Sequence, residues 1–254
     1  LPERIDSSMR TTLLQSYKTR DVPAWIETCL NSAQSWANAE GWSYRFLDDD
    51  VFDFVPAAIR DKLSGRPAMM SDIARLIWAR QVLSGGEGVE RVIWLNADVF
   101  VFAPQRIQIG EALDFAVGRQ VWIQPGTDKD LKVYRQVHNA ILLFTAQTPV
   151  LDFLIHAALS MAERLDCPAS PQMLGPKFLT ALHNMIGFPV IESVGMVSPL
   201  VLSDIASGGG AAWDRLTQVS ASQIRALNLC SSYRGQTVDG ILCDDALFET
   251  SIKA

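Results

Sequence analysis

Residues 91–102 constrain the fold more than any other part of the chain. They form an apolar run of β-branched and aromatic residues that is interrupted once, by Asn96-Ala97-Asp98. Runs of this kind are typical of strands buried on both faces of a parallel sheet. A carboxylate in such a run is costly unless the strand has reached a sheet edge or a cation lies near. We therefore predict a buried parallel strand that ends near Leu95 and places Asp98 in a cleft.

The remaining segments alternate between strand and helix patterns. Strands are predicted at residues 11–15, 43–47, 91–95, 115–117, 121–123, 139–144 and 189–191. Helices are predicted at residues 24–39, 51–63, 69–83, 150–165 and 176–187, with a polar loop at 124–132 and no assignment after residue 218. This alternation predicts the α/β class, with a mostly parallel central sheet flanked by helices on both faces.

The composition is that of a folded chain and narrows the function. The 254 residues suit one α/β domain, and the net charge of −6 leaves no basic face for nucleic acid. No apolar run is long enough for a transmembrane segment, and no signal peptide is recognised. Peripheral contact with a membrane is compatible with this sequence. The cysteines lie far apart without a CxxC pair, so we expect reduced thiols in a cytoplasmic protein rather than a disulfide framework or zinc site. They are Cys29, Cys167, Cys230 and Cys243.

Asp98 is the best candidate for a metal ligand. Hard cations such as Mn²⁺ and Mg²⁺ take oxygen ligands and bridge to phosphates. Asn96 would add a neutral oxygen or bind a sugar hydroxyl. The alternative is that Asp98 only caps a turn at the strand end, and the spacing does not separate the two.

Asp72 and Arg75 lie three apart on one side of a predicted helix. They form either a solvent-side ion pair or a ligand site in which Arg75 binds phosphate and Asp72 a sugar hydroxyl. Tyr17 follows the first strand, where α/β sheets place ligands, and either stacks on a base or packs in the core. The turn Gly175-Pro176-Lys177 opens a helix and is either an anion site or a plain turn.

Other mechanisms lack their signatures. The glycine loop at residues 85–88 precedes a strand and does not match the dinucleotide fingerprint. The chain has no GxxxxGK[ST] loop and no GxSxG elbow, and no local pattern supports a Cys–His hydrolase. His138 is a weak candidate, because a lone histidine is more often structural.

Five segments, taken in order, resemble glycosyltransferase family 32, which has a DXD sugar-binding region and the GT-A fold. The first is Leu14-Gln15-Ser16-Tyr17-Lys18-Thr19, similar to the family's His-Gln-Thr-Trp-Lys-Thr. The second, Ser71-Asp72-Ile73-Ala74-Arg75, resembles its Ser-Asp-x-x-Arg helix. The others are Leu95-Asn96-Ala97-Asp98-Val99, His138-Asn139-Ala140-Ile141 and Gly175-Pro176-Lys177-Phe178-Leu179-Thr180.

This resemblance implies a single GT-A domain over residues 1–254, with a nucleotide-sugar half at about 11–105 and an acceptor half at about 106–254. Tyr17 would stack on the base. The implied donor-binding residues are Gln15, Ser16, Tyr17, Asp72, Arg75, Asn96, Gly175 and Lys177. The implied catalytic residues are Asp98, Asn139 and Arg75, and Asp98 with Asn96 would hold Mn²⁺ or Mg²⁺.

The chain departs from this pattern at several positions. Leu14 replaces the family's histidine, and Asn96 replaces the first acid of DXD, which removes one negative charge. The longer segment before the central strand is similar to family 8, whose members use a late histidine as a metal ligand. This chain has no histidine after His183, and Asp239, Asp244 or Asp245 would have to substitute.

The predicted activity is therefore transfer of a sugar from a UDP- or GDP-sugar to a saccharide or lipid-linked acceptor, metal-dependent and with retention at the anomeric carbon. Such an enzyme would belong to polysaccharide biosynthesis. A non-catalytic nucleotide-sugar binding protein is the first alternative, because the first acid is missing. A nucleotidyltransferase is the second, and it would need a glycine-rich phosphate loop after the first strand.

Overall fold

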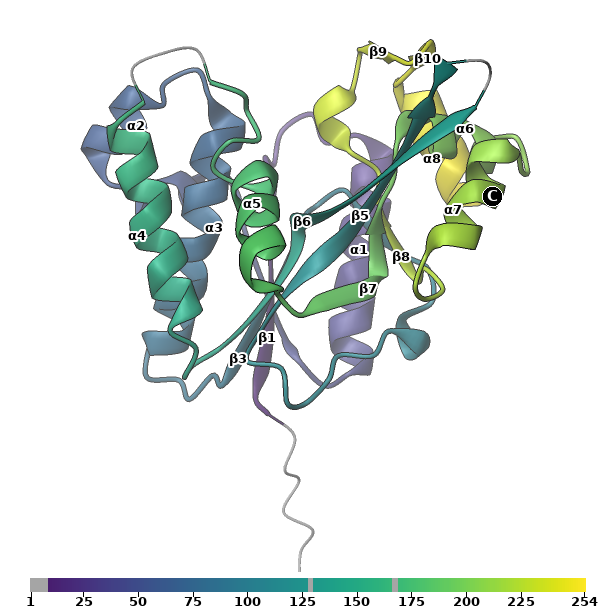
Figure 1. Ribbon diagram of the computed structural model, residues 1–254. Coiled ribbons are helices and arrows are strands. Elements are labelled where there is room, and N and C mark those ends of the chain that lie inside the picture. The colour runs from purple at the N-terminus through teal and green to yellow at the C-terminus, as the bar shows by residue number, and fades with distance from the viewer. Residues whose placement is uncertain (1–8, 128–129, 166–168) are drawn as a thin grey trace, which may run out of the picture.

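A computed structural model describes residues 9–127, 130–165 and 169–254 of the chain (Figure 1). Its strands are β1 (Thr11–Ser16), β2 (Ser43–Leu47), β3 (Arg91–Leu95), β4 (Val99–Val101), β5 (Phe115–Pro125), β6 (Leu131–Thr145), β7 (Val190–Met196), β8 (Ala226–Asn228), β9 (Thr237–Val238) and β10 (Ile241–Leu242). Its α-helices are α1 (Ala24–Ala39), α2 (Ala57–Lys62), α3 (Pro67–Ser84), α4 (Val150–Glu163), α5 (Pro176–Ile186), α6 (Pro199–Ala206), α7 (Ala211–Val219) and α8 (Asp245–Lys253). The 3₁₀ turns are η1 (Asp49–Phe54), η2 (Pro104–Arg106) and η4 (Ser231–Tyr233).

The core of the molecule is an eight-stranded sheet with the order β2-β1-β3-β6-β5-β7-β8-β4. β1 is parallel to β2 and β3, and β7 is parallel to β5 and β8. β6 runs antiparallel to β3 and β5, and β4 runs antiparallel to β8. Four of the seven neighbouring pairs are thus parallel, which confirms the predicted α/β class with a mostly parallel sheet. The sheet joins strands from both predicted halves of the chain.

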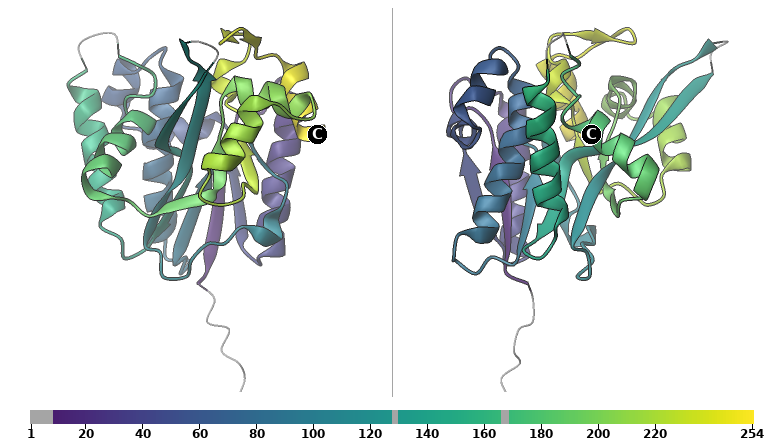
Figure 2. Two further views of the ribbon diagram at one scale, coloured as in Figure 1. Left: turned by 45° about the vertical axis from the view of Figure 1, so that its right-hand side comes forward. Right: turned by 60° about the vertical axis from the view of Figure 1, so that its left-hand side comes forward.

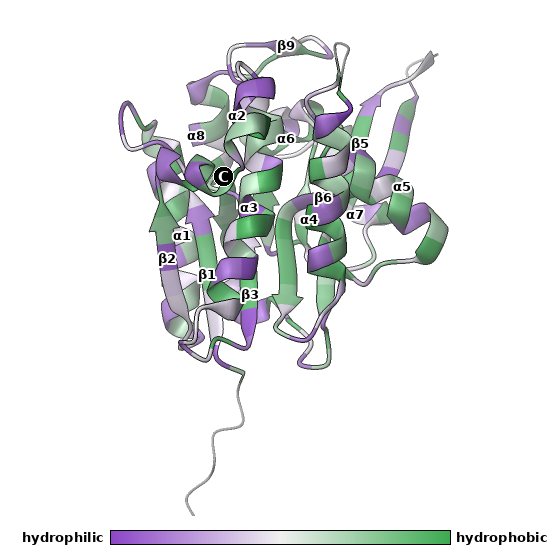
Figure 3. Ribbon diagram, turned by 90° about the vertical axis from the view of Figure 1, so that its left-hand side faces the viewer, coloured by the Kyte–Doolittle hydropathy of each residue, from purple (hydrophilic) through white to green (hydrophobic). Residues whose placement is uncertain are grey.

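Helices cover both faces of the sheet (Figure 2). Successive strand residues point to opposite faces, so Leu14 and Trp94 pack with α3 and α4, whereas Leu13 and Ile93 pack against Trp36 of α1. The hydropathy colouring shows the result, because most of β3 and the inner part of β6 are hydrophobic between these layers (Figure 3). A third apolar cluster joins α1 to α6, α7 and α8.

Several predicted boundaries were wrong. Residues 51–63 are not one helix, because Pro56 disfavours helical backbone before it and leaves η1 and α2 as separate elements. The strands predicted at 115–117 and 121–123 are one strand, β5, and the loop predicted at 124–132 is shorter because Gln124 pairs with Lys132 in the β5–β6 ladder. Polarity marked these residues as a loop, although those at both of its ends belong to paired strands.

The structure bears on part of the predictions about thiols and membranes. Cys29, Cys230 and Cys243 are free thiols, and Cys167 lies outside the described residues. Within the described ranges, none of the helices combines the length and the apolar character that membrane crossing requires.

Candidate functional site

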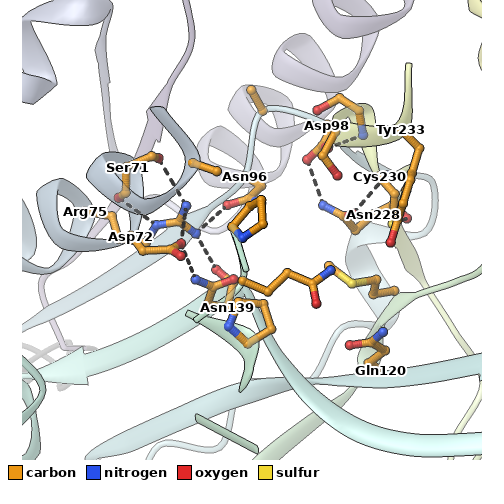
Figure 4. Close-up of a pocket in the computed structure, with 18 of the residues that line it drawn as sticks. Ser71, Asp72, Arg75, Asn96, Asp98, Gln120, Asn139, Asn228, Cys230 and Tyr233 are labelled. Carbon is orange, nitrogen blue, oxygen red and sulfur yellow. Dashed lines mark hydrogen bonds and ion pairs between the residues drawn. The ribbon is translucent and has the colours of Figure 1, made fainter. Parts of the chain in front are cut away.

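A pocket of about 510 Å³ opens where β1 and β3 end (Figure 4). Its lining comes from these strand ends, from α3, from β6 and from the segment after β8. The polar and aromatic residues in it include Ser16, Tyr17, Asp72, Arg75, Trp94, Asn96, Asp98, Gln120, Trp122, Asn139, Asn228, Ser231 and Tyr233. The carboxyl ends of parallel strands are where open α/β sheets bind ligands, so the location agrees with the prediction for Asp98.

Strand pairing brings these distant residues together. The backbone N–H of Asn96 donates to the carbonyl of Ala140 at 2.8 Å, which extends the β3–β6 ladder and places Asn139 beside Asn96. On the other side, Val99 of β4 pairs with Asn228 of β8. The segment Asn96-Ala97-Asp98 between β3 and β4 therefore lies between two antiparallel strands, β6 and β8, and it lines the pocket.

Arg75 lies at the centre of the hydrogen-bond network. Its Nε donates to the carbonyl of Ser71 at 3.1 Å, and one Nη2 hydrogen goes to Ser71 Oγ at 3.1 Å. Nη1 donates to Asn96 Oδ1 and to the Asn139 carbonyl, each at 3.0 Å, and Nη2 lies 3.1 Å from Asp72 Oδ1. Four of the five N–H donors of the guanidinium thus make hydrogen bonds, and Nη2 also forms the ion pair with Asp72. Arg75 therefore holds Asn96, Asp72 and the Asn139 backbone in place, and its direct contact with phosphate stays a prediction.

Asp72 and Arg75 are each only 6% exposed, so their ion pair is not on the solvent side of α3. Burial raises the pKa of Asp72, and Arg75 and Asn139 act in the opposite direction. The amide of Asn139 donates to Asp72 Oδ1 at 2.7 Å. The predicted Asp72, Arg75 and Asn139 thus form one connected buried unit, in contact with the pocket through all three members.

Asp98 is fixed by protein donors. Asn228 Nδ2 donates to its Oδ1 at 2.7 Å, and the backbone N–H of Ser231 donates to its Oδ2 at 2.7 Å. Asn228 is the last residue of β8 and Ser231 follows it, in a part of the chain for which the sequence indicated no structure. Asp98 is therefore more than the cap of its own turn, because it holds residues 228–231 against the pocket.

The residues around Asp98 do not fit a bound divalent cation. Asn96 Oδ1 accepts from Arg75 Nη1 at 3.0 Å and from Trp94 Nε1 at 2.8 Å, which uses both of its lone pairs. Asp244 caps α8 and Asp245 pairs with Arg234, so neither serves as a substitute ligand beside Asp98. Among the described residues, no group of three or more His, Cys, Asp or Glu side chains could hold a metal ion. The predicted Mn²⁺ or Mg²⁺ at Asp98 and Asn96 is not supported by this set of donors.

Three predicted donor-binding residues lie outside the pocket lining. Gln15 is buried, donates from Nε2 to the carbonyl of Asn96 at 3.2 Å and accepts from the hydroxyl of Tyr44. Gly175 packs against the side chains of Asp72 and Asn139. Lys177 lines a neighbouring cavity of about 350 Å³. Gln15 and Gly175 thus support the site from outside it.

Several pocket residues were missed by the sequence analysis. Trp122 and Tyr233 form an aromatic pair with ring centroids 5.6 Å apart, and Asn228 and Ser231 bind Asp98. Cys230 also lines the pocket, but burial, with a smaller contribution from Asp98, raises the pKa of its thiol and disfavours a thiolate nucleophile. The pattern Ala226-Leu227-Asn228 would have indicated a short strand, but it contains no signal for the contact between Asn228 and Asp98.

His138 is a structural residue. Its Nε2–H donates to the carbonyl of Val194 at 3.2 Å, and its Nδ1 accepts from the N–H of Ala140 at 2.9 Å, which requires the neutral ring. Burial lowers the pKa of His138 to about 4. It fixes the backbone beside Asn139 and does not line the pocket.

This burial predicts a pH dependence of stability. Between the unfolded pKa of 6.5 and the folded pKa of about 4, the unfolded chain binds the proton and the native chain does not. The free energy of unfolding should therefore fall as the pH drops through this window, by up to roughly 3 kcal/mol. Urea titrations at pH 7, 6, 5 and 4 would measure it. The variant His138→Gln should show a shallower slope, whereas His156→Gln, at an exposed position, should keep the wild-type slope; equal slopes for all three would contradict the assignment.

Fold and pocket together define an α/β protein with a polar and aromatic ligand site at the ends of its parallel strands. No protein-family model and no curated protein matches the sequence. Among solved structures, the galactosyltransferase LgtC, in complex with donor and acceptor sugar analogs, is similar at 12% identity and a TM-score of 0.47 over 96% of this chain and 95% of that one. A glycosyltransferase involved in glycosylation of the major capsid of PBCV-1 is similar at 10% identity and a TM-score of 0.46, covering 87% and 94%.

Mouse xyloside xylosyltransferase 1, in its apo form, is similar at 13% identity and a TM-score of 0.41, covering 87% of this chain and 97% of that one. Because these TM-scores lie below 0.5, the likeness does not by itself establish a shared family or activity.

Proposed function

We propose that this protein is a glycosyltransferase of the GT-A type that takes a nucleotide-sugar donor. The observation that carries the proposal is the composition of the pocket. The side chains of Tyr17, Trp94, Trp122 and Tyr233 line it together with amide, hydroxyl and carboxylate groups. Aromatic rings stack on bases and sugar faces, and amides and carboxylates bind hydroxyls in a defined orientation. A volume of about 510 Å³ suits a nucleoside together with a hexose.

In this proposal each part of the pocket has a distinct task. Tyr17 at the end of β1 stacks on the base, as the family resemblance implies. Asp72 and Asn139, held by Arg75, orient hydroxyls of the ribose or the transferred sugar. The acceptor, a saccharide or lipid-linked saccharide, enters beside Gln120 and Trp122 of β5. Retention at the anomeric carbon remains a prediction, and the proposal includes no step through a metal ion.

One experiment tests this function directly. A thermal-shift panel of UDP, GDP and their sugar conjugates should show stabilisation by at least one nucleotide, since ligand binding raises stability by mass action. Release of free nucleotide from the sugar conjugate over long incubation should then show slow donor hydrolysis. No stabilisation by any member of the panel would contradict the proposal.

A non-catalytic nucleotide-sugar binding protein is the second candidate. One observation favours it: the donors of Arg75 and the amide oxygen of Asn96 are already engaged by other protein groups. Such a site orients a ligand but offers little charge for stabilising a departing diphosphate. Nucleotide binding without any release of nucleotide from the sugar conjugate would identify this alternative.

Tyr17→Leu should weaken binding of the nucleotide that responds in the panel by about 10- to 100-fold, because one base–aromatic stack contributes about 1–3 kcal/mol. Isothermal titration calorimetry would measure the change. The matched control is Tyr134→Leu, which removes an exposed tyrosine on β6 that does not line the pocket. Equal affinity of the wild type and the Tyr17 variant would remove Tyr17 from the base site.

A further inference from the structure

The pocket contains two asparagines beside its one carboxylate on the β3–β4 and β8 side. Asn96 and Asp98 come from the turn after β3, and Asn228 comes from the end of β8 (Figure 4). The amide of Asn228 and the N–H of Ser231 each approach one oxygen of Asp98 to 2.7 Å. The other end of the Asn228 side chain is also engaged, because its Oδ1 accepts from the N–H of Cys230 at 2.9 Å. This fixes the orientation of the amide, with its NH₂ toward Asp98.

An NH₂ group that faces a carboxylate takes the place where a cation would bind. A hard divalent ion needs oxygen ligands on all sides, and at the distance of a hydrogen bond the Asn228 hydrogens would repel it. Turning the amide over would bring its oxygen to Asp98, but it would leave the N–H of Cys230 without its acceptor in a buried position. Asn96 offers no alternative ligand, because Arg75 and Trp94 saturate its oxygen.

We propose that this pocket binds its ligand without a divalent cation, and that Asn228 is the residue that makes it so. Protein N–H donors offset the negative charge of Asp98. In a cleft without such donors, a metal ion would have to offset it. The inference deepens the proposed function, because it states under which conditions the nucleotide sugar binds. It also separates this site from the metal-dependent type that the sequence resemblance implied.

The test converts Asn228 into an acid and follows stability rather than activity. Asn228→Asp places two carboxylates against each other at the position of the 2.7 Å hydrogen bond, so the variant should be destabilised in EDTA and recover when Mn²⁺ is added. Thermal unfolding with EDTA and with MnCl₂ should show a cation-dependent Tm for Asn228→Asp and none for the wild type. The control Asn31→Asp, at an exposed position on α1, should also show no response.

A second measurement keeps the inference testable if Asn228→Asp does not fold. Calorimetric titration of the wild type with MnCl₂ alone should give no binding in the micromolar range, and the result should be the same for Asp98→Asn. Micromolar Mn²⁺ binding by the wild type that Asp98→Asn abolishes would overturn the inference. UDP is the probe for the ligand itself, and its affinity should be equal in EDTA and in MnCl₂.

The two proposals fail in different ways. If neither UDP, GDP nor a sugar conjugate binds under any condition, the proposed function is wrong, while the Mn²⁺ measurements still decide the inference. If nucleotides bind only when MnCl₂ is present, the proposed function stands and the inference is wrong.

Discussion

Replacing Arg75 with methionine is expected to lower the free energy of unfolding by about 3–5 kcal/mol, which is the usual cost of removing one member of a buried ion pair. The variant leaves Asp72, which is only 6% exposed, with the amide of Asn139 and no neutralising cation. It also releases Asn96 Oδ1, the Asn139 carbonyl and the Ser71 hydroxyl from their shared donor. Urea unfolding at pH 7 measures the loss.

Two further variants make this prediction specific. Arg80→Met, in the same helix, removes an exposed ion pair with Asp152 and should cost less than about 1 kcal/mol. The double variant Asp72→Asn/Arg75→Met contains no unpaired buried charge and should be more stable than Arg75→Met alone. If Arg75→Met costs no more than Arg80→Met, Arg75 is not the anchor of the site.

Replacing Gly175 with alanine is expected to lower stability by about 1–3 kcal/mol and to abolish measurable ligand binding. A Cβ atom at this position collides with Asp72 Oδ2 and Asn139 Nδ2. Neither neighbour has room to move, because Arg75 holds Asp72 and Asp72 holds Asn139. The helix start or the buried pair must shift, and both define one wall of the pocket. Thermal unfolding and UDP titration of the same preparation measure the two effects.

Gly110→Ala is the matched control for this variant. A Cβ at Gly110 meets only the side chain of Leu113, at 3.4 Å, and the position is exposed. Its effect should lie within about 0.5 kcal/mol. A Gly175→Ala protein with wild-type stability and unchanged UDP affinity would show that α5 does not support the site in the way described.

Much of the fold could be predicted from local sequence patterns. β1, β2, β3, α1 and α3 begin and end within a few residues of their predicted positions, because apolar periodicity and strand composition are local signals. The β5–β6 hairpin was not predicted in full, because its outer half is polar and its strand structure comes from pairing between the two strands rather than from an apolar pattern. The same applies to β8, which exists only against β4 and β7.

By itself, the sequence indicated several of the residues that reach the pocket from the first half of the chain, although Gln15, predicted with them, lies outside its lining. A buried strand that ends in Asn96-Ala97-Asp98, and a helix with Asp72 and Arg75 on one side, point to the end of β3 wherever the later strands lie. Tyr17 follows from the same rule after β1, whereas Ser16 was implied by the family resemblance. These assignments depend on strand ends and helical spacing, which are local properties.

Only the tertiary structure decided what these groups do. Whether a carboxylate binds a metal or a protein N–H depends on the donors that face it, and those donors come from Asn228 and Ser231, about 130 residues later. Whether an arginine is free for phosphate depends on how many of its donors the fold has already used. Hydrogen-bond partners of this kind are set by long-range strand pairing, which leaves no local pattern in the sequence.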